Sequence, residues 1–250
     1  MATKPNILAI ESSCDDTGAA VLSNGEILSN IISSQQIHSQ HGGVVPELAS
    51  RDHQKNIVYV VQSAIEQSGL SLKNIDALAI TAGPGLLGSL LVGLSFAKGV
   101  ALSINKPLIE VNHLDAHILA HFIDNPQPQL PFMCLLVSGG HTQIVLVKEP
   151  LNHEIIGKTI DDAAGEAFDK GAKIMGLPYP GGPIIDKNAK LGNGNAFHFN
   201  KPKVKDYNYS FSGLKTALLY FLRDQLKENK AFIHENINDL CASWQKVIVD

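Results

Sequence analysis

The chain has 250 residues, 44% of them hydrophobic and 18% charged, and a formal net charge of −4. This composition excludes a disordered tail, and the length is sufficient for one large or two small globular domains. The slight acidic excess excludes a general polyanion-binding protein of the histone type. Three widely separated cysteines exclude a disulfide framework. Because the start has no signal-peptide pattern and no apolar run approaches the ~20 residues that span a bilayer, we expect a cytoplasmic protein without membrane association.

Strands and helices alternate along the chain, which predicts an α/β architecture. The first half predicts strands at 7–10, 19–22, 26–33, 75–81 and 107–111, the first three as a meander, and helices at 54–68, 90–103 and 113–122. The second half predicts strands at 132–137, 143–148 and 155–160, helices at 161–175, 213–227 and 237–249, and a loop at 177–183. Asn112 is placed to cap the helix that follows it.

Two stretches of the chain repeat one pattern. Residues 8–22 and 135–147 both read as an apolar strand, a small polar turn and a second apolar strand, and Ser12 and Ser138 open the two turns. This repeat predicts two similar halves that face one another across a cleft, with exposed turn N–H groups around a phosphate. Chance similarity of two short hairpins is the alternative.

His113 and His117 are four residues apart on a predicted helix, so their imidazoles share one face. This spacing allows both rings to bind one divalent metal ion, although a third protein ligand or substrate oxygens must complete the site. A pair of histidines on the helix surface is the alternative. No Glu follows the first histidine, which excludes the HExxH pattern of zinc proteases.

Glycines 83, 85 and 88 match the GxGxxG fingerprint between a strand and a helix, with Glu110 at the end of the next strand. The fingerprint is typical of dinucleotide-binding folds. However, the chain opens with a strand meander instead of this βαβ unit. Close packing of the helix start against the cleft is the alternative use of these glycines.

The segment 138–142, Ser-Gly-Gly-His-Thr, lies between two strong apolar runs. Adjacent glycines allow the backbone to approach a ligand, and a tight hairpin is the alternative. Asp161 and Asp162 favour the start of the next helix through its dipole. Asp169 and Asp186 flank a Gly/Pro loop, where carboxylates suit ribose hydroxyls, although each is also typical of a surface charge.

Glu11, Asp15 and Asp16 cluster in the turn after the first strand. Such carboxylates can hold a metal, orient an amine or act as a base, and a solvated Asx turn is the alternative. Cys14 lies among them without an identifiable base partner, so we expect it to be structural.

Seven motifs follow one another in this chain: 10–17 (IESSCDDT), 42–53 (GGVVPELASRDH), 83–90 (GPGLLGSL), 112–117 (NHLDAH), 136–142 (LVSGGHT), 161–169 and 211–216 (FSGLKT). Together they closely resemble the tRNA N6-adenosine threonylcarbamoyltransferase family, once described as O-sialoglycoprotein endopeptidases. The resemblance implies an actin/Hsp70/sugar-kinase fold of duplicated, ribonuclease H-like α/β domains around a nucleotide cleft. It places the first domain at 1–111 and an incomplete second domain at 112–250.

The resemblance also implies the reaction. The threonylcarbamoyl group passes from threonylcarbamoyl-AMP to N6 of adenosine 37 in tRNAs that read ANN codons, and AMP is released. The implied site residues are the metal ligands His113 and His117, the adenylate-binding residues Leu136, Val137, Ser138, Gly139, Gly140, His141, Asp169, Gly182 and Asp186, and the acidic Asp15 and Asp16 near the reacting centre. We expect one divalent metal ion, with Fe²⁺ favoured over Zn²⁺, and hypothesise that Asp15 or Asp16 assists proton removal.

The partners implied are tRNA, a paralogous scaffold subunit and a small ATPase subunit. The basic stretch 201–223 is the candidate tRNA surface. Family members have about 340 residues by this resemblance, and a further aspartate ligand is expected after Asp250, so we expect these 250 residues alone to be inactive or impaired. The alternatives are a non-catalytic scaffold paralogue, a metalloprotease and, from the glycine fingerprint, a nicotinamide oxidoreductase.

Overall fold

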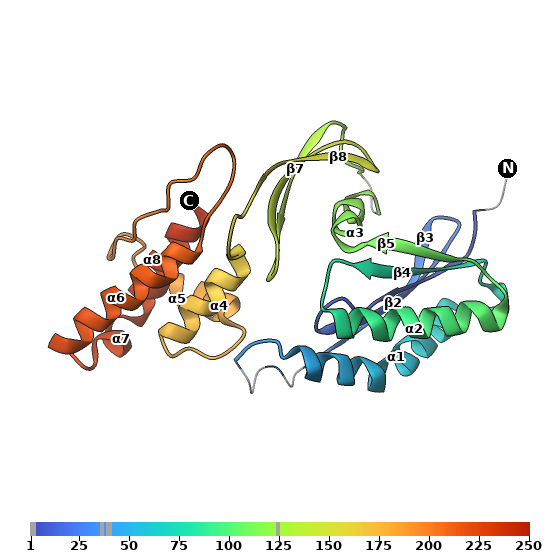
Figure 1. The fold of residues 1–250 in the computed structure, drawn as a ribbon, viewed down its shortest axis with the longest axis horizontal. Helices are drawn as coiled ribbons and strands as arrows, with labels where there is room; N and C mark the ends of the chain where they lie inside the picture. Colours follow the sequence, from blue (N-terminus) through green and yellow to red (C-terminus); the bar gives the residue numbers. More distant parts are fainter. Residues whose placement is uncertain (1–3, 36–37, 39–41, 124–125) are drawn as a thin grey trace. The chain divides into compact units, whose positions relative to one another are not determined.

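The computed structural model describes residues 4–35, 38, 42–123 and 126–250. It divides into two compact units, unit 1 (Met1–Gln127) and unit 2 (Pro128–Asp250), shown in Figure 1. Unit 1 extends past the expected boundary at residue 111, because the helix that follows packs against two of its strands. The predicted metal ligands therefore belong to unit 1.

Unit 1 contains a mixed five-stranded sheet. Its strands are β1 (Ile7–Glu11), β2 (Asp16–Ser23), β3 (Glu26–Ser34), β4 (Ala77–Gly83) and β5 (Leu108–Asn112). The sheet order is β3-β2-β1-β4-β5, with β1, β2 and β3 antiparallel and β1, β4 and β5 parallel. The predicted meander of the first three strands is confirmed.

Two long helices cover this sheet: α1 (Pro46–Ser68) packs on β2 and β3, and α2 (Leu87–Ile104) packs on β4. Alternate residues of β1, Leu8 and Ile10, point into the core between sheet and helices. α1 begins eight residues before the predicted helix, because Pro46 occupies the first turn, where proline favours helix initiation. By length and composition alone, α2 could cross a bilayer, and it is the one such helix among the described residues. In this structure its residues Ala97 and Ala101 pack into the core of unit 1.

The short helix α3 (His113–Leu119) follows β5 directly and continues as a 3-10 turn over Ala120–Phe122. The Asn112 side chain accepts hydrogen bonds from the backbone N–H groups of Leu114 at 2.9 Å and Asp115 at 3.2 Å. This confirms the predicted cap. The cap fixes the start of α3, and therefore the position of His113, relative to the end of β5.

Unit 2 combines a three-stranded antiparallel sheet with a helical layer. The strands are β6 (Phe132–Val137), β7 (Thr142–Glu149) and β8 (Asn152–Lys158); the helices are α4 (Ala164–Ile174), α5 (Gly181–Ala189), α6 (Ser212–Glu228), α7 (Phe232–Glu235) and α8 (Ile237–Val249). The hairpin β6–β7 repeats the hairpin β1–β2, and β8 repeats β3, so each unit opens with an antiparallel meander. The predicted α/β fold of the actin-like class is confirmed by this topology.

Two predictions for unit 2 were wrong in detail, and one short helix was missed. The predicted loop at 177–183 already contains the first turn of α5, which tolerates Pro183 near its start. α7 was not predicted, because four residues are too few to show a helical period. Asp161 does not begin α4; its carboxylate accepts from the hydroxyls of Ser210 and Ser212 and from the N–H of Phe211, at the start of α6.

The core of unit 2 centres on Trp244 of α8, which is fully buried. The indole ring lies against Gly171 of α4, where a Cβ atom would come within 2.9 Å of Trp244 Cζ2 and would overlap Nε1. Glycine at this position therefore allows α4 and α8 to pack closely, whereas Gly99 of α2 has no neighbouring atom within 4 Å of such a Cβ.

These two helix-interior glycines give a matched prediction. Gly171→Ala destabilises the protein by ~1–3 kcal/mol, because the methyl group forces the indole or the helix to move. Gly99→Ala stabilises it by ~0.5–1 kcal/mol, because alanine restricts the unfolded chain and meets open space. Urea unfolding of both variants measures the two free energies, and equal signs would contradict the packing described here.

Candidate active site

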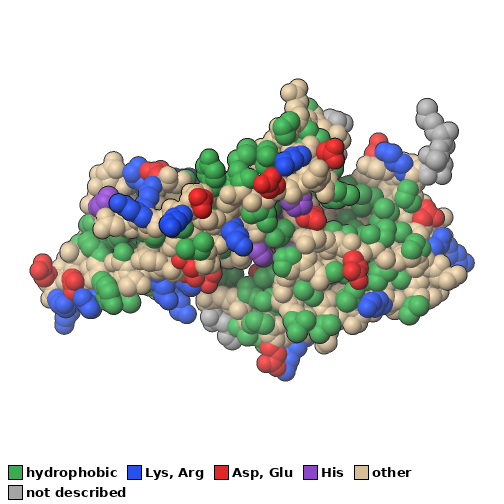
Figure 2. All heavy atoms as spheres, turned by 45° about the horizontal axis from the view of Figure 1, so that its top comes forward, with side chains coloured by type: hydrophobic (Ala, Val, Ile, Leu, Met, Phe, Trp, Pro, Cys, Tyr) green, Lys and Arg blue, Asp and Glu red, His purple; other side chains and the backbone are tan. Residues whose placement is uncertain are grey.

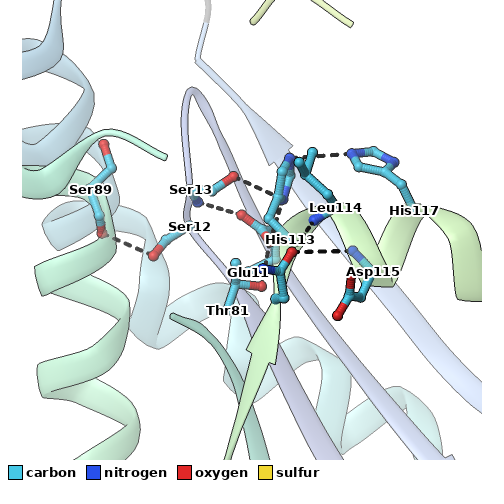
Figure 3. A network of polar contacts seen from close by, with 10 residues as sticks. Glu11, Ser12, Ser13, Thr81, Ser89, His113, Leu114, Asp115 and His117 are labelled. Carbon is cyan, nitrogen blue, oxygen red and sulfur yellow. Dashed lines mark hydrogen bonds and ion pairs between the residues drawn. The ribbon is translucent and has the colours of Figure 1, made fainter. Parts of the chain in front are cut away.

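The polar residues of unit 1 gather where its parallel strands end. β1, β4 and β5 run in the same direction, so their carboxyl ends meet at one edge of the sheet. Glu11 is the last residue of β1, Thr81 lies near the end of β4, and His113 directly follows β5. Ligands of open α/β sheets bind at this edge. It is the candidate active site, shown in Figure 3.

The turn between β1 and β2 is held by buried polar contacts with α2. The Ser12 hydroxyl donates to the carbonyl of Ser89 at 2.9 Å, and the Ser89 hydroxyl donates to the carbonyl of Cys14 at 3.1 Å. The N–H of Leu86 donates to the carbonyl of Ser13 at 2.7 Å. Both Ser12 and Ser89 are fully buried. A buried polar group left unpaired costs ~1–3 kcal/mol, so these contacts fix the path of the turn.

His53 of α1 holds the same turn from within the core. Its Nε2 lies 3.0 Å from the carbonyl oxygen of Cys14, and its Nδ1 lies 2.7 Å from the hydroxyl oxygen of Thr17. Because a carbonyl only accepts, Nε2 carries the proton and Nδ1 accepts from the threonine hydroxyl. His53 is fully buried. The sequence showed it only as the last residue of a motif, since both of its partners lie more than 35 positions away.

The GxGxxG loop serves packing in this structure. A Cβ atom on Gly85 would lie 2.5 Å from the carbonyl oxygen of Ser13, and one on Gly93 would overlap the Ser12 hydroxyl. A Cβ on Gly88 would lie 3.2 Å from Ser50 of α1. The glycines therefore let α2 and its preceding loop approach the β1–β2 turn, as the packing alternative predicted.

Glu11 is the centre of a hydrogen-bonded network in Figure 3. Its Oε1 accepts from the N–H of Ser13, and its Oε2 accepts from the hydroxyl of Thr81 at 2.5 Å and lies 3.3 Å from Nδ1 of His113. Burial acts to raise the pKa of Glu11, but the hydrogen bonds from His113, Ser13 and Thr81 outweigh it and lower the pKa to about 2. Glu11 is therefore an anion throughout the physiological range.

The two predicted metal-ligand histidines converge. Nε2 of His113 and Nε2 of His117 are 3.2 Å apart, and the rings meet edge to face with centroids 4.6 Å apart. Nitrogens this close can both bind one ion at the ~2.0–2.1 Å bond length of imidazole to zinc. Among the residues that the structure describes, no third His, Cys, Asp or Glu completes a metal-binding group. The pair thus offers a metal ion two protein ligands.

Asp15 and Asp16 lie in the same β1–β2 turn as Glu11. Asp15 is half-buried and its carbonyl accepts from the N–H of Gln35, whereas Asp16 is exposed at the start of β2. Cys14 is exposed at the surface, but partial desolvation of its thiol, with added repulsion from Asp15, Asp16 and Glu11, raises the pKa of that thiol to about 12. The thiol therefore stays protonated at neutral pH and is not an activated nucleophile, while the structural role expected of Cys14 stays a prediction.

In unit 2 the predicted glycine turn is built around Ser138. Its hydroxyl accepts from the N–H of His141 at 3.0 Å and of Gly140 at 3.3 Å, so two of the turn's N–H groups are already paired. Leu136 is buried and Val137 is exposed at the end of β6, and Gly139 is exposed in the turn.

The start of α4 is joined to this turn. The Thr142 hydroxyl accepts from the N–H of Ala164 at 2.9 Å, and the carbonyl of Ser138 accepts from the N–H of Gly165 at 3.3 Å. A Cβ on Gly165 would lie 2.7 Å from that carbonyl oxygen. Thr142 belongs to the segment 138–142 that the sequence singled out, whereas Gly165 was not predicted as a site residue, because its partner Ser138 becomes a neighbour only in the folded unit.

Asp169 and Gly182, two predicted adenylate-binding residues, lie together. Asp169 Oδ1 accepts from the N–H of Gly181 at 2.8 Å, at the start of α5. Burial raises the pKa of Asp169, although hydrogen bonds from the N–H groups of Gly181 and Gly182 act in the opposite direction. Asp186, the third residue of this group, lies further along α5 and pairs with Lys190 at 2.6 Å.

Comparison with known proteins shows the family of this chain. Residues 26–250 match the family model described as tRNA N6-adenosine threonylcarbamoyltransferase. The chain is 63% identical over 249 residues to the protein of that name from Phocaeicola vulgatus, covering 98% of this chain and 74% of the relative. It is 62% identical over 247 residues to the one from Riemerella anatipestifer, covering 98% and 72%.

Among solved structures, YeaZ from Pseudomonas aeruginosa aligns with a TM-score of 0.43 and 16% identity, over 61% of this chain and 66% of that one. The family match extends over nine-tenths of the present chain and includes the histidine pair, the glycine turn and α4. The chain belongs to the tRNA N6-adenosine threonylcarbamoyltransferase family, whose members are transferases that modify tRNA.

Proposed function

We propose that this protein transfers the threonylcarbamoyl group from threonylcarbamoyl-AMP to N6 of adenosine 37 in tRNAs that read ANN codons. The observation that carries the proposal is the convergence of two imidazole Nε2 atoms, 3.2 Å apart, at the carboxyl edge of the unit 1 sheet in a chain of this family. The N6 amine attacks the carbamoyl carbon, the bond from that carbon to the phosphate oxygen breaks, and AMP leaves with the electron pair. The amine loses one proton in the process.

His113 and His117 are proposed to hold one divalent metal ion. Imidazole nitrogens suit both Fe²⁺ and Zn²⁺, with Fe²⁺ favoured as the family resemblance implies. When bound, the ion withdraws negative charge from the phosphate or carbamoyl oxygens as it develops. The substrate itself, or a further ligand, completes the coordination that two histidines leave open.

Asp15 or Asp16 is proposed to take the proton that the N6 amine loses. An adenine amine is a poor nucleophile, so a base close to the attacking nitrogen lowers the barrier. The β1–β2 turn supports this role, because its path is fixed by the buried contacts of His53, Ser12 and Ser89. A fixed turn holds its carboxylates in a reproducible position.

The adenylate is proposed to bind to unit 2, at the glycine turn (Leu136–His141) and at Asp169, Gly182 and Asp186. The exposed Gly139–Gly140 backbone lets a phosphate approach closely. Asp169 already binds the N–H groups at the start of α5, which supports a role in fixing the backbone beside Gly182.

Two alternatives have less support. A scaffold paralogue has no need for a converging histidine pair, which the family resemblance places in the enzyme. In a protease of the Ser-His-acid type, the serine hydroxyl and the acidic side chain form hydrogen bonds with different nitrogens of the histidine ring. Here the Ser13 hydroxyl and the Glu11 carboxylate both lie 3.3 Å from the same Nδ1 of His113.

For the docking of tRNA we propose the basic segment before and along α6. Lys201, Lys203 and Lys205 are exposed and alternate with half-buried residues, which is typical of an extended segment with its charges on one side. Within the described part of the chain no ion pair within 4 Å involves these three lysines, although the charge of Lys201 helps to lower the pKa of Asp250. Arg223 lies 4.8 Å from the ring centroid of the exposed Tyr220. Figure 2 shows basic side chains at the surface of the molecule, with acidic side chains among them.

We further propose that the protein is located in the cytoplasm. We also propose that it assembles with a paralogous scaffold subunit and a small ATPase subunit. The impaired turnover expected for these 250 residues alone stays a prediction. Binding of metal and of tRNA gives readouts that do not depend on turnover.

Metal binding tests the histidine pair. His113→Ala and His117→Ala each abolish the binding of one Zn²⁺ or Fe²⁺ per chain, because either change leaves a single imidazole. Isothermal titration of the metal-free protein measures this directly. His121→Ala, one helical turn further on, is the matched control and keeps the wild-type stoichiometry. Full metal binding by His113→Ala would contradict the proposed site.

Transfer kinetics test the acidic turn. Asp15→Asn and Asp16→Asn combined lower the rate of threonylcarbamoyl transfer by ~10²–10⁴-fold, as expected for loss of a general base, and leave adenylate affinity unchanged. A single-turnover assay with threonylcarbamoyl-AMP and tRNA measures the rate. Asp76→Asn is the control, since Asp76 binds the N–H of Asn6 at the opposite edge of the sheet. With a wild type that transfers the group measurably, unchanged transfer by the double variant would show that neither carboxylate is the base.

The salt dependence of tRNA binding tests the lysine segment. Replacing Lys201, Lys203 and Lys205 by Ala weakens binding and reduces the slope of log K against log salt by about 1 for each phosphate that the variant no longer neutralises. Replacing the exposed Lys55, Lys73 and Lys98 of unit 1 removes the same charge and leaves the slope unchanged. Equal effects of the two triple variants would rule out a specific docking surface.

A further inference from the structure

The contacts of Nδ1 of His113 determine which nitrogen of that ring carries the proton. Nδ1 lies 3.3 Å from Oε2 of Glu11 and 3.3 Å from the hydroxyl oxygen of Ser13. A carboxylate oxygen only accepts hydrogen bonds, whereas a hydroxyl oxygen can accept as well as donate. The contact with Glu11 is favourable only when Nδ1 bears the hydrogen.

Glu11 is itself held in the position of an acceptor. The Thr81 hydroxyl donates to the same Oε2 at 2.5 Å, and the N–H of Ser13 donates to Oε1. These donors come from β4 and from the β1–β2 turn, and Glu11 is the last residue of β1. Three segments therefore fix the direction in which the carboxylate faces His113.

The consequence appears at the other ring nitrogen. With the proton on Nδ1, Nε2 of His113 has a free lone pair, and this atom is the one that converges on Nε2 of His117 at 3.2 Å. In the metal-free protein His117 therefore donates from its Nε2 to His113. A carboxylate that binds the second nitrogen of a metal-ligating histidine fixes its tautomer and raises its basicity.

We propose that Glu11 is a positioning residue of the reaction: it holds His113 as the Nδ1–H tautomer and so directs Nε2 at the metal ion. This inference rests on the proposed metal site, to which it adds a residue that itself offers no oxygen to the ion. Thr81 supports Glu11 in this role and Ser13 shares the Nδ1 proton.

Conservative substitutions of Glu11 and Thr81 test these contacts. Glu11→Gln keeps the shape of the side chain but can turn an N–H group toward Nδ1, which then favours the other tautomer. Thr81→Val removes only the hydroxyl that fixes Glu11, and Thr81→Ser restores it. Glu110→Gln makes the same change at an exposed carboxylate of β5, and it controls for loss of charge.

Long-range ¹H–¹⁵N spectra of the metal-free protein at neutral pH test the inference without any activity measurement. The expected result is an Nδ1–H signature for His113 in the wild type, in Thr81→Ser and in Glu110→Gln. In Glu11→Gln the population shifts to Nε2–H, and in Thr81→Val it shifts in the same direction to a smaller extent. An unchanged His113 tautomer in Glu11→Gln overturns the proposal.

Metal titration provides the second readout. Glu11→Gln weakens Zn²⁺ binding by ~10–100-fold, the usual effect of losing an outer carboxylate, while Glu110→Gln binds as the wild type does. A wild type that binds no metal overturns the proposed metal site, and the metal-free spectrum still decides the tautomer. A normal tautomer shift with unchanged Zn²⁺ affinity overturns the positioning role of Glu11.

Discussion

The structure of the candidate site depends on one constraint: the turn that joins β1 to β2 is tied to its neighbours by buried polar contacts. Carbonyls of this turn accept from His53, Ser89 and Leu86, three residues on α1, on α2 and just before α2. Because each such contact is costly to break inside the core, the turn cannot move independently of both helices. Glu11 and Asp16 lie at the two ends of this turn, so their positions are fixed as well.

Glycines of the loop before α2 and of α2 itself are part of the same constraint. Gly85 and Gly93 lie where the β1–β2 turn comes closest, and neither has a side chain that would keep the turn away. The serine hydroxyls and backbone carbonyls of α2 and the turn can therefore form hydrogen bonds with one another. A dinucleotide fingerprint and a packing motif have the same sequence, because both need backbone to approach closely. The two uses differ in what approaches the glycines: a dinucleotide in the first and a protein segment in the second. Here the β1–β2 turn of the same chain lies against them.

Much of the fold could be predicted from local patterns. The strand meanders follow apolar runs broken by turns, and the cap of α3 by Asn112 depends on residues two and three positions away. The histidine pair also follows from local spacing, since a helix brings positions four apart together. These features were predicted because their cause lies within one or two turns of chain.

Features that depend on distant partners were not predicted. Asp161 was placed at the start of α4, but its partners are 49 to 51 positions away at the start of α6. Likewise, Thr81 meets Glu11 across 70 positions, and no pattern near either residue indicates the contact. The sequence identified the residue types of the site, whereas the folded sheet edge determines which of them touch.

The most direct test of this account is the position of a metal ion in crystals of the protein grown with Zn²⁺, located by its anomalous scattering. The account predicts one strong peak bonded to Nε2 of His113 and Nε2 of His117, with Glu11 still on Nδ1 of His113. A peak on Nδ1, or an ion bound directly by Glu11, would contradict it.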